Sequence, residues 1–296
     1  MIAFRLFQLL VFVLYLFPYR WRRRFYAFLA RVTYAVDGKH KRVIRQNLDF
    51  AFDGTLDAAE IETIGRYCYR NAAFAFTQVI ENRVLSPEAI GERVRFENRA
   101  PVDAAVAAGR PVIFVTAHYG NWEIAGAAIS NFLIPITVIY RKLNNPHFDR
   151  YLYESRRAIG IETVEKSGAA RALAKILKSG GAVTLLTDQN TSRRDGVAVK
   201  FFGKTVHQTA TPAFLARKYD AALIPLYTTT EDDEHYTVTF GDPIEVAKSD
   251  DAESDVFTAT QTQAQYHETA IRMAPKFWFW CHRRWKTDHP EIYRKP

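Results

Sequence analysis

The sequence of 296 residues has little cysteine and no apolar run long enough to cross a bilayer comfortably. Its two cysteines, Cys68 and Cys281, lie far apart in the sequence, so we expect neither thiol to have the other near it. This excludes a CxxC zinc or redox motif and predicts a reduced protein that faces the cytosol. His, Cys and Asp do not cluster at zinc-ligand spacing, so we expect no metal and no cofactor.

Positive charge is present in excess and is concentrated near the start of the sequence. The formal net charge is +8, and nine Lys or Arg against one acid, Asp37, lie between Tyr19 and Arg45. The preceding stretch, Ile2 to Tyr19, is apolar but shorter than the ~20 residues of a comfortable membrane span. It would lie in the interface or barely cross, and the alternative is a buried helix.

Basic and aromatic residues after an apolar stretch match the headgroup level of an anionic leaflet. A signal peptide would have its charges before the apolar stretch, whereas here they follow it. We therefore predict a hydrophobic membrane anchor over residues 1–25 and a main domain over residues 26–296. The positive-inside tendency places that domain on the cytoplasmic side of the inner membrane. The basic residues concerned are Arg20, Arg22, Arg23 and Arg24.

The main domain alternates short apolar runs with helical patterns, which is the rhythm of βαβ units. Wholly apolar strands such as Val112–Val115 indicate a parallel sheet covered on both faces. The predicted fold class is α/β, with a mostly parallel central sheet flanked by helices. Strands are predicted at 94–96, 112–116, 136–140, 182–186 and 222–227, and helices at 57–85, 122–132, 147–159, 169–178 and 210–217. Residues 231–234 are predicted to form a hairpin tip and 248–255 a solvated loop.

The stretch from Ala117 to Glu123, at the carboxyl end of the strand 112–116, is the most informative in the sequence. Five residues turn a helix by ~500°, so His118 and Glu123 cannot share one helical face. If Gly120 makes a turn and Asn121 caps a helix, Glu123 can approach the imidazole and leave one ring nitrogen free as a general base. The alternative is an ordinary strand-end histidine and a helix-start acid.

The HxxxxE box, here HYGNWE, resembles the motif of the glycerolipid acyltransferase superfamily, and its flanks resemble the lipid A biosynthesis (late) acyltransferases. Further blocks agree in order: Tyr140-Arg141-Lys142 with Asn145-Pro146, Thr187-Asp188-Gln189, Val199 to Gly203, and the tail around Trp280, His282-Arg283-Arg284 and Lys286-Thr287. The resemblance implies an O-acyltransferase that takes a fatty acyl chain from an acyl carrier protein thioester to a hydroxyl of a Kdo-bearing lipid A precursor. His118 and Glu123 would be its catalytic residues.

Several further residues are predicted to bind substrate. Arg141 would hold a phosphate or neutralise an oxyanion, and the alternative is a surface salt bridge. Asp188 and Gln189 would bind sugar hydroxyls or orient Arg141, or else cap a turn. Phe201, Phe202 and Gly203 would suit an acyl channel, although paired aromatics are more often core. Arg194 and Arg283 would meet lipid phosphates, or else be solvated or paired.

The predicted partners are acyl carrier protein, a glycolipid acceptor and an anionic membrane surface, with no nucleic acid. One alternative is an enzyme of the same superfamily that acylates another glycolipid from acyl-CoA. The remote alternative is a basic module without activity that binds membranes or nucleic acid by charge. An apolar stretch beside the basic block, and the lack of a recognised nucleic-acid motif, disfavour it.

Overall fold

The computed structural model describes residues 2–294. Its centre is a seven-stranded sheet in the order β1-β9-β8-β2-β5-β3-β4. Every neighbouring pair is parallel except β8 and β9, which are antiparallel, so the mostly parallel α/β sheet is confirmed. The strands are β1 (Val94–Glu97), β2 (Val112–Thr116), β3 (Ile136–Tyr140), β4 (Glu162–Glu165), β5 (Ala182–Leu186), β8 (Ala222–Thr230) and β9 (Tyr236–Phe240).

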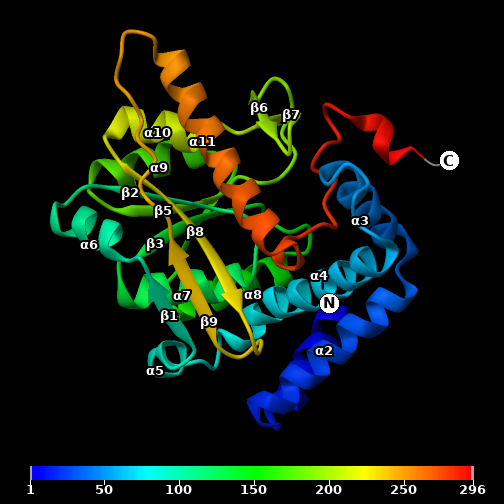
Figure 1. Cartoon of the computed structure of the whole chain (residues 1–296). Helices are drawn as coiled ribbons and strands as arrows, with labels where there is room; N and C mark the ends of the chain where they lie inside the picture. Colours follow the sequence, from blue (N-terminus) through cyan, green and yellow to red (C-terminus); the bar gives the residue numbers. More distant parts are fainter. Residues whose placement is uncertain (1, 295–296) are drawn as a thin grey trace.

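Helices cover both faces of this sheet, as the wholly apolar strand β2 predicts. One face packs on α7, and the other packs on α9, α10 and part of α11. The remaining helices lie around this core, with α2, α3 and α4 gathered on the side opposite α6, α9 and α10 (Figure 1). The bounds are α5 (Pro87–Gly91), α6 (Ala100–Ala107), α7 (Trp122–Phe132), α8 (Pro146–Ala158), α9 (Ala169–Lys178), α10 (Thr211–Tyr219) and α11 (Ala252–Met273).

The N-terminal third forms four consecutive helices that pack beside the sheet domain. The predicted capping box is present at the start of α4, where Asp57 and Glu60 bond each other's backbone N–H groups. The predicted boundary between residues 25 and 26 falls inside α2, and residues 1, 295 and 296 of the two predicted domains lie outside the described part. The helices are α1 (Ile2–Tyr15), α2 (Tyr19–Val36), α3 (Gly38–Ala51) and α4 (Ala58–Glu81).

No helix in residues 2–294 has both the length and the apolar character that a bilayer crossing requires. The apolar stretch breaks at Pro18, the N-cap of α2. The basic block also differs from the prediction, because Arg22 and Arg23 are buried. Arg22 forms a bidentate pair with Glu81 of α4, and Arg23 donates to the Tyr236 hydroxyl at 2.7 Å. These two arginines therefore tie α2 to the core rather than facing lipid headgroups.

The C-terminal part contains a two-stranded hairpin, a long helix and an irregular tail. The hairpin pairs β6 (Val197–Phe201) with β7 (Lys204–Gln208), and the tail contains the short helices η1 (Pro275–Phe277) and η2 (Pro290–Tyr293). The hairpin tip predicted at 231–234 is confirmed between β8 and β9. The loop predicted at 248–255 is wrong in its second half, because α11 begins at Ala252 and Asp255 is buried against Arg217.

Candidate active site

The chain turns sharply between β2 and α7, as the sequence predicts. Gly120 has φ of +62°, and a Cβ atom there would lie 1.8 Å from the backbone oxygen of Thr228, so only glycine fits. Asn121 caps α7 by accepting from the backbone N–H of Ile124 at 3.2 Å. His118 consequently lies at the carboxyl end of β2, and Glu123 lies in the first turn of α7.

The carboxylate that holds the His118 ring is Asp188. Its Oδ1 lies 2.9 Å from His118 Nδ1, and its Oδ2 accepts from the backbone N–H of His118 at 3.0 Å. The contact follows from the sheet, because β2 and β5 are parallel neighbours with Thr116 opposite Leu186. His118 and Asp188 each lie two residues beyond that pair, so they are neighbours at the carboxyl edge of the sheet.

Glu123 makes a different contact from the predicted one. Its carboxylate is paired with the guanidinium of Arg156 on α8, with Nε to Oε2 at 3.1 Å and a second bond from Nη2 to Oε1. Both side chains are largely buried, so this is a desolvated ion pair. The expectation that Glu123 orients the imidazole is therefore wrong, and Asp188, predicted to bind sugar or orient Arg141, orients it instead.

Asp188 is held as an anion by its surroundings. Burial acts to raise the pKa of this carboxyl, but the charge and hydrogen bond of the His118 imidazole, with help from His267 and the Trp278 indole, bring the pKa below its ordinary value. Trp278 Nε1 donates to Oδ2 at 2.8 Å. With Asp188 accepting from Nδ1, the other nitrogen, Nε2, is left unprotonated in the neutral ring, which is the form that a general base needs.

His118 opens on a cavity of about 1080 Å³ at the carboxyl edge of the sheet. Its side chain is 22% exposed, and its ring lies edge-on to Trp122. Glu123, Arg141 and Gln189 also line this cavity, so four predicted site residues meet there. The exposed mouth carries the charged side chains Arg141, Lys166 and Asp195 together with neutral polar ones, and Ile129, Ile136 and Ile161 line the buried part. A polar mouth and an apolar end suit a ligand with a polar head and a hydrocarbon tail. The neutral polar residues of the mouth are Asn190, Thr191, Ser192, Thr209 and Thr211.

Arg141 and Gln189 have distinct surroundings in this cavity. Arg141 is exposed directly after β3, and within residues 2–294 no carboxylate lies at ion-pair distance from it, so the alternative of a surface salt bridge is not realised. The amide nitrogen of Gln189 lies 3.4 Å from His118 Nε2, a long and weak contact.

The tail after α11 packs against the carboxyl edge of β2 and β5 and forms hydrogen bonds with it. The backbone N–H of Phe279 donates to the His118 oxygen at 2.9 Å, and His282 Nε2 accepts from the Asn190 N–H at 3.0 Å. Arg284 is buried and donates to the Gln189 backbone oxygen at 2.8 Å. Burial lowers the pKa of Arg284 to about 10, against the attraction of Asp188 and Asp288.

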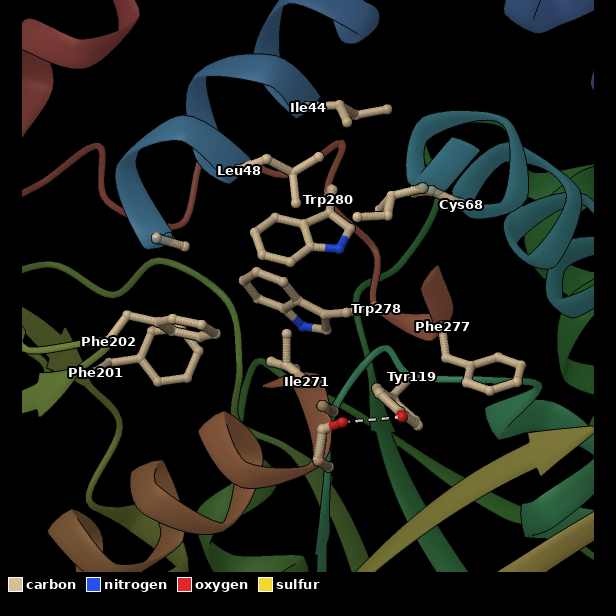
Figure 2. Close-up of a cluster of buried hydrophobic side chains, with 14 of the residues drawn as sticks. Ile44, Leu48, Cys68, Tyr119, Phe201, Phe202, Ile271, Phe277, Trp278 and Trp280 are labelled. Carbon is tan, nitrogen blue, oxygen red and sulfur yellow. Dashed lines mark hydrogen bonds between the residues drawn. The ribbon is translucent and has the colours of Figure 1, made fainter. Parts of the chain in front are cut away.

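The other predicted substrate residues lie away from the cavity. Phe201 and Phe202 are 1% and 2% exposed and pack with Trp278, Trp280 and Trp285 in an aromatic cluster. Figure 2 shows them beside the indoles of Trp278 and Trp280, which pack edge to face, below Leu48. The predicted acyl channel at these positions is therefore wrong, and the core alternative holds.

Gly203, Arg194 and Arg283 do not line the cavity either. Phe202 and Gly203 form the tip of the β6–β7 hairpin, with φ of +54° and +71°. The Arg194 side chain is 91% exposed and pairs with Asp195. The Arg283 guanidinium stacks on the Tyr293 ring, and its neighbour Arg284 holds the catalytic edge instead.

The two cysteines are close in space, contrary to the prediction. The Sγ atoms of Cys68 on α4 and Cys281 in the tail are 4.0 Å apart, and both thiols are free. The hydrogen bond with the Cys68 thiol, together with burial, raises the pKa of Cys281. Their large separation in the sequence does not indicate this contact, because α4 and the tail meet only in the folded chain.

Known proteins resemble this chain along most of its length. The family model described as bacterial lipid A biosynthesis acyltransferase matches residues 2–287. The chain therefore belongs to that family of acyltransferases.

Individual relatives have two kinds of name. A phosphatidylinositol mannoside acyltransferase of Mycolicibacterium smegmatis is 28% identical over 62% of this chain and 60% of its own length. One from Mycobacterium tuberculosis is 28% identical over 65% of this chain and 60% of its own. The lipid A biosynthesis lauroyltransferase of Escherichia coli is 29% identical over 60% of this chain and 57% of its own. The matches thus span less than two thirds of each relative.

Proposed function

We propose that this protein transfers a fatty acyl chain from a thioester donor to a hydroxyl of a glycolipid acceptor. The observation that carries the proposal is the His118–Asp188 pair, whose free ring nitrogen faces a cavity with a polar mouth and an apolar end. A base without a neighbouring nucleophilic side chain suits direct attack by the acceptor hydroxyl. Membership of an acyltransferase family supports the same chemistry.

In the proposed reaction the His118 imidazole first accepts a proton and later donates it. His118 Nε2 takes the proton of the acceptor hydroxyl as its oxygen attacks the thioester carbonyl, and Asp188 stabilises the resulting imidazolium. Arg141, at the mouth, would stabilise the tetrahedral oxyanion. When the C–S bond breaks, the imidazolium returns the proton to the thiolate, so an ester and a free thiol leave.

The acceptor we favour is a Kdo-bearing lipid A precursor, and the donor is acyl carrier protein. The family description and the Escherichia coli relative support a lipid A acceptor. A carrier protein with an acidic surface would meet the exposed cations Arg141 and Lys166 of the lining and the adjacent Lys142, whereas Arg193 and Arg194 are paired with Asp288 and Asp195. The second candidate is a phosphatidylinositol mannoside with an acyl-CoA donor, because three relatives have that acceptor in their names.

A grid of donors and acceptors tests the proposal. Purified protein is incubated with acyl carrier protein or CoA thioesters of one chain length, and with a lipid A precursor or a mannosylated phosphatidylinositol, and products are identified by mass spectrometry. We expect the lipid A precursor and carrier-protein combination to have the highest kcat/KM. That rate should fall with rising salt if the cationic mouth recruits the carrier. No ester product in any combination would overturn the function.

We also propose that α1 and α2 dock this enzyme on the cytoplasmic face of the inner membrane. Large apolar side chains are exposed along both helices and in the turn between them, including Phe12 at 63%, Phe28 at 57% and, in the turn, Leu16 at 69%. Arg20, Arg24 and Arg31 are exposed among them, which suits anionic headgroups. Two helices lying in the interface fit this arrangement better than one that crosses it.

Vesicle sedimentation tests the docking. Phe12→Ser with Phe28→Ser should weaken binding to anionic vesicles by tenfold or more, because two exposed aromatic side chains leave the bilayer. Met273→Ser is the control, since Met273 is exposed at 82% but lies at the end of α11. Equal binding by the double variant and the control would refute this surface.

A further inference from the structure

The cavity continues from the mouth into a slot between the sheet and two helices. In β3 the residues that face α7 line it, and α7 and α8 supply the opposite walls. Leu152, on the same α8 wall as Arg156, and Leu186 of β5 face the slot along its length. The lining includes β3 residues from Tyr140 to Ile136, a rise of four residues or about 13 Å.

Exposure to solvent differs between the two ends of the slot. At the mouth the His118 side chain is 22% exposed, and Val138, Leu152 and Leu186 are half-buried. At the far end Ile129, Ile136 and Ile161 are 1%, 1% and 2% exposed. The slot is therefore open at the catalytic edge and closed at these three isoleucines.

At the closed end of the slot, two isoleucine side chains pack against a glycine of α7. A methyl group added at Gly126 would lie 3.1 Å from Ile161 Cδ1 and 3.6 Å from Ile136 Cδ1. The absence of a side chain at Gly126 thus lets the two isoleucine tips pack against the helix. Ile161 lies between α8 and β4, so its side chain reaches the slot from outside the sheet.

We propose that Ile161, packed with Ile136 over Gly126, is the stop that sets the length of the transferred acyl chain. The inference rests on the proposed acyl transfer, because it places the chain with its carbonyl at His118 and its terminal methyl at Ile161. A donor that is too long cannot bring its thioester to the imidazole without displacing a buried side chain. A donor that is too short leaves apolar wall unfilled and loses about fourfold in kcat/KM per missing methylene.

Two kinds of substitution should move the preference in opposite directions. Ile161→Ala removes three carbons from the stop and should favour donors about two methylenes longer, with at least a tenfold change in the ratio of kcat/KM for long over short donors. Ile161→Val removes only the atom over Gly126 and should shift the preference less, in the same direction. Gly126→Ala pushes Ile161 toward the slot and should favour shorter donors.

The experiment measures kcat/KM for thioesters from decanoyl to stearoyl with one acceptor. Ile124→Ala is the matched control, because Ile124 is a fully buried isoleucine of the same helix that does not line the slot. It should lose comparable stability without changing the chain-length profile. Thermal unfolding of each variant shows whether it is folded.

The outcomes separate this inference from the proposed function. An active wild type whose profile stays unchanged in Ile161→Ala, Ile161→Val and Gly126→Ala would overturn the stop while leaving acyl transfer intact. A profile shifted equally by Ile124→Ala would also overturn it. A wild type that esterifies no acceptor with any donor would instead remove the proposed function itself.

Discussion

Two parts of the active-site cavity each hold a buried carboxylate, and they differ in what the carboxylate contacts. At the edge formed by β2 and β5, Asp188 accepts from an imidazole, an indole and a backbone N–H. On the wall formed by α7 and α8, Glu123 is paired with the guanidinium of Arg156. In the proposed reaction the first carboxylate supports a group that takes up and releases a proton, whereas the second neutralises a fixed cation. The HxxxxE spacing alone does not distinguish these roles.

The largest expected effect comes from removing the base. His118→Ala should lower kcat by about 10⁴-fold while the protein stays folded, because general-base catalysis is lost but Asp188 keeps the backbone N–H of residue 118 and Trp278 as donors. Steady-state kinetics with circular dichroism would check this. Activity close to that of the wild type would show that the base lies elsewhere.

Asp188→Asn should lower kcat by about 10³-fold, since an amide neither fixes the Nδ1–H tautomer nor stabilises the imidazolium. The control is Asp255→Asn, which changes another buried, hydrogen-bonded carboxylate that pairs with Arg217 far from His118. Equal losses in the two variants would mean that Asp188 serves only the fold.

Glu123→Gln should lower kcat by about tenfold and destabilise the protein by about 3 kcal/mol, because Arg156 keeps its charge in a buried place without a carboxylate. Chemical denaturation and steady-state kinetics, compared with Asp188→Asn, measure the contrast. A loss of kcat as large as that of Asp188→Asn, without destabilisation, would assign Glu123 a direct catalytic role.

Trp278→Phe should lower kcat by a few fold, because Asp188 loses one donor while the ring still fills its place. Trp285→Phe is a close control, since Trp285 is buried in the same aromatic cluster and its Nε1 has no partner within residues 2–294. If both substitutions lower kcat equally, packing rather than the hydrogen bond explains the effect.

His267 supplies a pH-dependent contrast beneath the same edge. Its Nε2 lies 2.7 Å from the hydroxyl of Thr187, and burial lowers its pKa from 6.5 to about 4. Between about pH 6.5 and 4 the imidazole is protonated in the unfolded chain but neutral in the folded chain. The free energy of unfolding therefore decreases as the pH is lowered through this window, and His267 does not affect it above the window. Between pH 7 and 5 the wild type should lose about 2 kcal/mol relative to His267→Gln in urea unfolding. A constant difference between the two proteins would contradict this assignment.

The central strands could be predicted because they are short and mostly apolar, whereas β4 and β9, which carry polar residues at alternate or terminal positions, were not predicted. The bounds of β2, β3 and β5 agree with the predicted ones, and the turn through Gly120 into α7 follows from local chemistry. Helix α11 could not be predicted from apolar periodicity, since its buried face carries polar residues such as Thr260, Gln263 and His267. That face packs by hydrogen bonds and small side chains, which no hydropathy pattern records.

The site could be predicted only where sequence neighbours decide it. The positions of His118 and Glu123 follow from seven consecutive residues, whereas the contact with Asp188 depends on β5 lying beside β2. Arg156 and Trp278 are brought in by α8 and the tail, and nothing in their local sequence marks them. The strand-end position of Asp188 was the available signal, because parallel neighbours end at one edge.

The tail that packs behind this edge is also the last part of it to be synthesised. The ribosome delivers residues 277–284 after all seven strands of the sheet, yet these residues contact His118, Asp188 and Gln189. A nascent chain can therefore form its sheet before the groups around the imidazole are all in place.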